Sequence, residues 1–103
     1  MTNIELKAYY KQQAEWHKGQ AQFYEDSIKW YREAAKKSRK EDREFIAWVM
    51  QNPNYSDAEK AATKGFKSSE TKSNEKLVRK HRTMLKQYLK WVAYYESELA
   101  KLA

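Results

Sequence analysis

The chain has 103 residues and no cysteine, and its 21 Lys and Arg exceed its 14 Asp and Glu to give a net charge of +7. A chain of this length forms one domain with a modest core, and the lack of cysteine excludes disulfides, thiolate metal sites and cysteine nucleophiles. Two glycines, one proline and 34% charged residues are typical of long solvated helices, and argue against a sheet protein rich in turns. We therefore predict a single all-α domain over residues 1–103.

The first predicted helix runs from about residue 3 to about residue 51, and it has an unusually wide aromatic face. One aromatic row recurs every seven residues, and a second apolar row lies beside it. Together they are wider than the ~100° apolar stripe of an ordinary surface helix. The face either packs into the chain's own core or forms a self-association surface, as in a homodimer that completes a four-helix bundle. The candidate residues for self-association are Tyr9, Trp16, Phe23, Trp30, Tyr24 and Tyr31.

A short second helix is predicted over residues 57–64. Pro53 ends the first helix, because the residue before a proline is pushed out of the α region. Ser56 and Glu59 have the spacing of a capping box, in which each side chain binds a backbone N–H at the start of a helix. Gly65 is predicted to end the helix in the left-handed conformation, with Phe66 making the accompanying apolar contact.

The third predicted helix, over about residues 72–102, has the clearest pattern in the chain. Two positions of a seven-residue repeat are apolar or aromatic over more than three repeats, which indicates coiled-coil-like packing. The residues are Val78, Leu85, Val92 and Leu99 at one position and His81, Tyr88, Tyr95 and Leu102 at the other. The two long helices thus predict an antiparallel helical hairpin with the short helix at its tip, in which residues 36–51 lie near residues 70–86.

The positive charge is concentrated between residues 36 and 90, where 15 Lys and Arg stand against 7 Asp and Glu. On the third helix the cations form a ridge opposite the heptad core, about 27 Å long at 1.5 Å per residue. The predicted main contacts to a polyanion are Lys72, Lys76, Arg79, Lys86 and Lys90, and Lys80 and Arg82 flank them. Secondary contacts are predicted at Lys37, Arg39, Lys40 and Lys64, which the hairpin brings to the same pole.

A basic pole of this kind attracts either nucleic acid or an acidic protein surface. No base-reading motif is present, so nucleic acid is expected to be held mainly through its phosphates, and any preference is expected to be for shape or for unpaired bases stacked on exposed Tyr or Trp. The alternative is a helical protein–protein module: an adaptor, or an inhibitor of a nucleic-acid-handling enzyme like the accessory proteins of phages and mobile elements. A self-associating structural bundle, whose charge only keeps it soluble, is a third interpretation.

Catalytic and metal-binding motifs are missing from the sequence. The only histidines are His17 and His81, and no Ser/His/Asp set, phosphate-binding glycine loop or H-E-x-x-H motif occurs. We expect no enzymatic activity, cofactor, metal or small-molecule substrate. The N-terminus lacks the features of a signal peptide and no apolar run is long enough to span a bilayer, so we expect a cytoplasmic protein with no membrane partner.

The length and the two long helices resemble the WXG100 class of small helical-hairpin proteins exported by type VII secretion. Tyr94 and Glu98 provide the Y-x-x-x-E element of that class. The W-x-G signature between the helices is absent, and Lys64-Gly65-Phe66 is the nearest sequence to it. The resemblance therefore concerns shape and implies only a helical hairpin.

Overall fold

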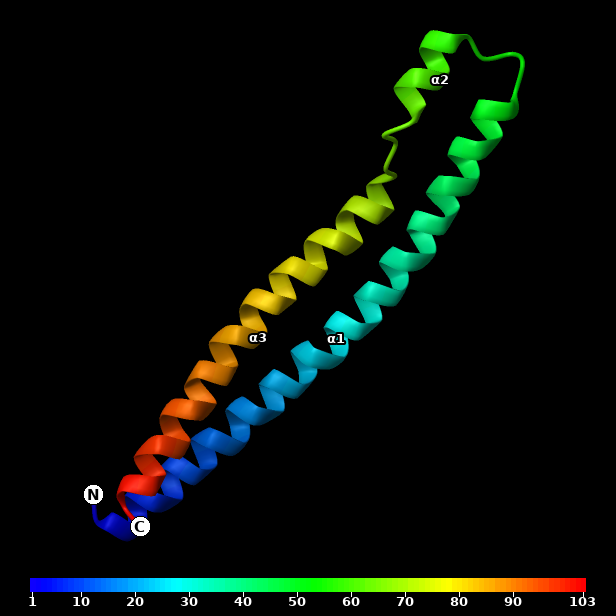
Figure 1. Cartoon of the computed structure of the whole chain (residues 1–103). Coiled ribbons are helices and arrows are strands. Elements are labelled where there is room, and N and C mark those ends of the chain that lie inside the picture. The colour runs from blue at the N-terminus through cyan, green and yellow to red at the C-terminus, as the bar shows by residue number, and fades with distance from the viewer. The chain divides into compact units, whose positions relative to one another are not determined.

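The computed structural model describes residues 1–103 and contains three helices and no strand (Figure 1). They are α1 (Asn3–Gln51), α2 (Asp57–Thr63) and α3 (Ser69–Lys101). The predicted all-α fold, in which the first long helix packs against the last, is confirmed. The chain divides into two compact units, a first unit of residues 1–29 and 79–103 and a second unit of residues 30–78.

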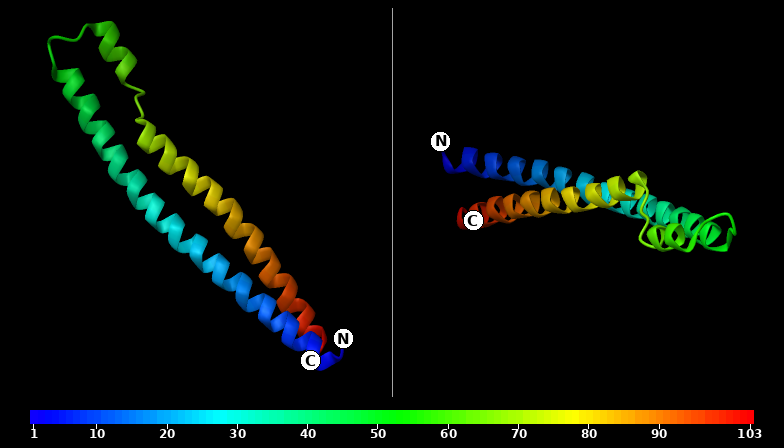
Figure 2. Two further views of the ribbon diagram at one scale, coloured as in Figure 1. Left: turned by 180° about the vertical axis from the view of Figure 1, so that it is seen from behind. Right: turned by 90° about the horizontal axis from the view of Figure 1, so that it is seen from above.

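The first unit pairs the N-terminal part of α1 with the C-terminal part of α3 in antiparallel orientation, and both chain ends lie at the same end of it (Figure 2). The buried residues of α1 include Ala14, Ala21 and Ile28, which are spaced by seven residues. From α3, Val92 is buried, and the other predicted heptad residues of this unit are partly buried. The heptad interpretation of α3 is therefore confirmed, and α1 has a matching seven-residue repeat.

Aromatic rings fill much of the space between these two helices. Tyr24 of α1 stacks on Tyr88 of α3, with ring centroids 5.5 Å apart and planes inclined by 19°. The buried His17 ring lies 5.2 Å from the ring of Tyr95, and its Nδ1 is 2.6 Å from the carbonyl oxygen of Gln13. Small alanines at the neighbouring heptad position leave room for these large rings, which is how facing layers of a core interdigitate.

Of the two rows predicted on the first helix, the apolar row packs into the core and the aromatic row is largely exposed. The row that includes Ala14, Ala21 and Tyr24 faces the core, whereas the side chains of Trp16 and Phe23 are 54% and 60% exposed. A single partner helix covers only one of the rows, because an α-helix presents a limited arc to a neighbour.

The second unit contains the C-terminal part of α1, all of α2 and the first turns of α3. The predicted capping box is present, since Ser56 Oγ accepts from the Glu59 N–H and the Glu59 carboxylate accepts from the Ser56 N–H. Helix α2 buries no residue, so this cap and the contacts of its flanking loops hold it in place. The ring of Phe66, just after α2, lies 5.0 Å from the ring of Phe45 on α1.

The prediction that Gly65 ends α2 in the left-handed conformation is wrong. No residue of the chain has a positive φ. Helix α2 ends one residue earlier than predicted, at Thr63, and Lys64 keeps right-handed helical geometry. Its N–H donates to the carbonyl of Ala61 over 3.4 Å, a tightened last turn that satisfies a terminal carbonyl without a left-handed residue.

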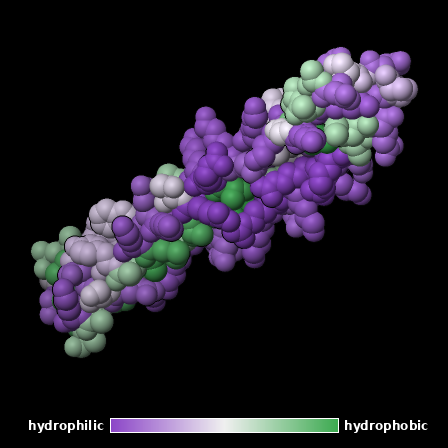
Figure 3. Space-filling model, turned by 45° about the horizontal axis from the view of Figure 1, so that its top comes forward, coloured by the Kyte–Doolittle hydropathy of each residue, from purple (hydrophilic) through white to green (hydrophobic).

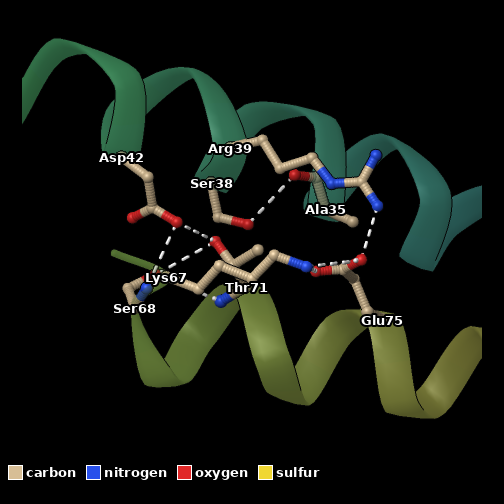
Figure 4. Close-up of polar contacts among 8 residues, drawn as sticks. All are labelled: Ala35, Ser38, Arg39, Asp42, Lys67, Ser68, Thr71 and Glu75. Carbon is tan, nitrogen blue, oxygen red and sulfur yellow. Dashed lines mark hydrogen bonds and ion pairs between the residues drawn. The ribbon is translucent and has the colours of Figure 1, made fainter. Parts of the chain in front are cut away.

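A polar cluster joins α1 to the start of α3 in the second unit (Figure 4). The buried carboxylate of Asp42 accepts from the hydroxyl of Thr71 over 2.6 Å and from the N–H of Ser68 over 3.2 Å. Ser68 also caps α3, because its Oγ accepts from the Thr71 N–H. This cap explains why α3 begins at Ser69, three residues before the predicted start. A carboxylate at a helix N-terminus is favoured by the helix dipole.

Hydrophilic residues cover most of the face drawn in Figure 3, and hydrophobic residues are exposed on it in separate patches. None of the three helices combines the length and the apolar character needed to cross a membrane.

Candidate polyanion-binding surface

Within the first unit, α3 carries a group of cations with no acidic residue beside them along the helix. The sequence contains no Asp or Glu between Glu75 and Glu96. The cationic side chains that this unit contributes to the interval are exposed, and none of them forms an ion pair. We call this set the α3 cation group, and it consists of Arg79, Lys80, Arg82, Lys86 and Lys90.

Two other cations of the first unit differ from this group, because an acidic neighbour neutralises each of them. Lys18 binds Glu96 over 2.6 Å, and Lys101 binds Glu98 over 2.9 Å. In both cases the hydrogen bond to the carboxylate raises the pKa of the lysine. The cations of this unit that remain available to a partner are therefore the α3 cation group and Lys7, Lys11 and Lys29 of α1, and only the α3 cation group lies on a stretch of helix without acidic residues.

Helical geometry places three members of the group almost in line. Arg79, Lys86 and Lys90 are separated by seven and four residues, so they share one side of α3, while Lys80 and Arg82 lie to either side. From Arg79 to Lys90 the helix rises about 16 Å. Phosphates follow one another at about 3.4 Å along each strand of a duplex, so the line is long enough to meet several of them.

In the second unit, one of the predicted cations is already engaged within the protein. Arg39 binds Glu75 over 2.6 Å, and Lys67 binds the same carboxylate over 3.1 Å (Figure 4). The hydrogen bond from Arg39, followed by that from Lys67, lowers the pKa of Glu75. The other predicted cations of this unit are exposed and form no ion pair. They are Lys37, Lys40, Lys64, Lys72 and Lys76.

The predicted proximity of residues 36–51 to the start of the third helix holds within the second unit. The contacts of Arg39 with Glu75 and of Asp42 with Thr71 join these segments. Of the predicted ridge, Lys72 and Lys76 belong to this unit, whereas Arg79 to Lys90 belong to the first unit. The cations of the predicted ridge therefore fall into two groups, one in each unit.

One feature beside the α3 cation group was not among the predicted sites. An open depression of about 570 Å³ is lined by Gln87, Lys90, Trp91 and Tyr94. Trp91 and Tyr94 are 50% and 49% exposed although both rings are large. The pattern of the sequence held a signal for them, because neither residue occupies a core position of the heptad repeat.

The residues predicted for self-association are distributed between the surface and the core. In the first unit Tyr9, Trp16 and Phe23 are exposed, whereas Tyr24 packs against Tyr88. In the second unit Trp30 is 67% exposed, and its ring contacts that of the partly buried Tyr31 at 4.9 Å.

No group of three or more His, Cys, Asp or Glu side chains is arranged to hold a metal ion. Comparisons of the chain with known proteins found no matching protein family, curated protein or solved structure.

Proposed function

We propose that the protein binds nucleic acid, without catalysing a reaction, through the α3 cation group. The observation that carries the proposal is the set of five exposed cations on one helix with no ion pair among them. Keeping like charges together weakens a helix, since charged faces are normally stabilised by oppositely charged neighbours three or four residues away. A polyanionic ligand provides the missing counter-charges.

Binding of this kind is recognised by its dependence on salt. Each phosphate contact releases a condensed counterion, so the logarithm of the binding constant falls with the logarithm of salt concentration, by about 0.7–0.9 per contact. Five contacts give a slope between about −3.5 and −4.5. We expect this slope for oligonucleotides measured by fluorescence anisotropy between low and physiological salt.

A triple variant, Arg79→Gln/Lys86→Gln/Lys90→Gln, tests which cations make the contacts. It is expected to flatten the slope by about 2–3, one contact per residue removed. The matched control, Lys7→Gln/Lys11→Gln/Lys29→Gln, removes the same charge from exposed positions of α1 in the same unit. Lack of binding at low salt, or equal effects of the two triple variants, would refute the proposal.

An acidic protein surface is the alternative ligand for the same cations, because carboxylates replace phosphates as counter-charges. The protein would then be an adaptor, or an inhibitor of a nucleic-acid-handling enzyme. Either ligand fits a cytoplasmic protein. Absence of oligonucleotide binding, together with capture of a defined acidic protein that the triple α3 variant fails to capture, favours this alternative.

A second function, self-association as a homodimer, is favoured by an uncharged strip on α1. Tyr9, Trp16 and Phe23 recur every seven residues, and Gln12 and Gln20 lie between them on the same side of the helix. Interface cores are enriched in aromatic residues and depleted of charge. The strip also carries no charge in a chain of net charge +7, so it adds no electrostatic repulsion between two copies.

The order of residues in the strip makes it complementary to itself. Trp16 is at the centre, with a glutamine four residues away on each side and an aromatic ring seven residues away on each side. In a two-fold antiparallel pair centred on Trp16, Tyr9 meets the partner's Phe23 and Gln12 meets the partner's Gln20. Identical patches that face each other in this way define an isologous interface.

Light scattering across a concentration series measures this association. We expect a monomer–dimer equilibrium that Trp16→Gln shifts strongly toward monomer. Trp48→Gln is the matched control, because Trp48 lies outside the strip and is 56% exposed, close to the 54% of Trp16. A chain that stays monomeric at high concentration, or that responds equally to both variants, contradicts the dimer.

A further inference from the structure

We infer that the depression beside Lys90 is a platform on which unpaired bases stack, so that the nucleic acid bound is single-stranded. The inference rests on the proposed function and specifies its ligand. It is carried by the juxtaposition, on one side of α3, of two exposed aromatic rings with the end of the α3 cation group.

The two rings are held in place by the packing beneath them. The Trp91 ring is stacked on that of Tyr95, with centroids 5.9 Å apart and planes inclined by 27°, and lies 6.1 Å from the buried His17. Tyr94 meets Trp91 at 5.8 Å, with planes inclined by 89°. Half of each side chain nevertheless stays exposed. A ligand therefore meets rings that are already ordered, which reduces the entropy lost on binding.

The polar side chains of the depression suit a nucleotide. Lys90 contributes a cation directly beside the rings, and Lys86 lies one helical turn before it on α3. Gln87 offers an amide with both donor and acceptor groups to a base edge. Proteins that bind single-stranded nucleic acid commonly combine aromatic rings, on which the bases stack, with cations that bind the phosphate backbone.

A duplex cannot use these rings in the same way, because its bases are already stacked on one another. A single strand gains about 1–3 kcal/mol for each base stacked on an aromatic side chain. The platform therefore predicts tighter binding of a single strand than of a duplex of equal charge. It predicts little dependence on sequence, since every base has a flat face.

A protein whose only tryptophan is Trp91 tests contact with the bases directly. The other three, Trp16, Trp30 and Trp48, are replaced by Phe. We expect oligo(dT) to quench the emission of Trp91, and inorganic polyphosphate, which has charge but no bases, to leave it nearly unchanged. In the matched protein that keeps only Trp48, oligo(dT) is expected to have little effect. Unchanged Trp91 emission at saturating oligo(dT) would overturn the platform.

Affinity measurements provide the second test. We expect Trp91→Leu/Tyr94→Leu to weaken single-strand binding about tenfold or more, to change duplex binding less than twofold, and to preserve the salt slope. Trp48→Leu is the control. If the double variant loses helical content by circular dichroism, Tyr94→Leu alone replaces it.

The outcomes separate the inference from the function on which it rests. Equal weakening of single-strand and duplex binding overturns the platform but leaves phosphate binding by the α3 cation group intact. Absence of binding to either oligonucleotide at low salt overturns both.

Discussion

At the scale of single residues, Asp42 shows how one buried carboxylate joins two helices. It occupies the same seven-residue repeat as the buried Ala35 and Val49 of α1, yet it is charged. Hydrogen bonds from Thr71 and Ser68 satisfy it, and an unsatisfied charge at this position would be costly. Asp42 lies between Glu41 and Arg43 in a run of charged residues, and its position in the repeat of α1 is the sequence signal that it is buried.

The same contacts predict a dependence of stability on pH. The hydrogen bond from Thr71 is the main cause of the lowered pKa of Asp42, so the folded state binds this proton less readily than the unfolded state. The stabilisation is therefore complete above the ordinary carboxyl pKa of about 4, and is lost as pH falls through and below that value. Urea unfolding between pH 7 and pH 3 should show a steeper loss of stability in the natural protein than in Asp42→Asn.

The matched control is Glu44→Gln, which removes an exposed acid from the same helix. Glu44→Gln should keep most of the pH dependence of stability, because Asp42 is intact in it. Glu75, whose pKa is also lowered, is intact in both variants and accounts for the pH dependence that remains in Asp42→Asn. A pH profile that is identical in Asp42→Asn and the natural protein contradicts the assignment.

At the scale of elements, the long helix α1 passes through Gly19 without interruption. A glycine weakens a helix interior by about 1 kcal/mol relative to alanine. No atom within 4 Å would meet an added Cβ, so this chain gives the glycine no packing role. We expect Gly19→Ala to raise the free energy of unfolding by about 1 kcal/mol in dilute urea titrations.

Gly19 also lies at the edge of the uncharged strip, which links this prediction to self-association. A loss of stability in Gly19→Ala that grows with protein concentration would contradict a purely intrahelical effect. It would show instead that a second chain packs on this position, because a small residue permits close approach of two helices.

At the scale of the whole molecule, positive charge is present in both units. The first unit has 10 Lys and Arg against 6 Asp and Glu, and the second has 11 against 8. Both units contain cations that are paired with carboxylates. The α3 cation group differs from these, because no acidic residue lies between Glu75 and Glu96. Net charge alone therefore does not distinguish one surface of the molecule from another, whereas the stretch of α3 without acidic residues does.

The helices and their repeats follow from local properties of the chain. Heptad spacing, a proline after α1 and a capping box before α2 act over a few residues, so they can be read without knowledge of the fold. The bounds of α1 agree with its prediction. The start of α3 does not, because Asp42 supports the cap at Ser68 from a distant part of the chain.

Contacts between distant segments were beyond the reach of the sequence. The sequence showed an aromatic row and an apolar row on α1, but which of them is covered depends on where α3 lies. The rotation of one helix against another is set by packing between them. In the same way, the sequence showed a basic stretch between residues 36 and 90, whereas the pairing of Arg39 with Glu75 requires two helices to meet. Local spacing thus specified the elements, and only packing between them separated buried rings from exposed ones and paired cations from available ones.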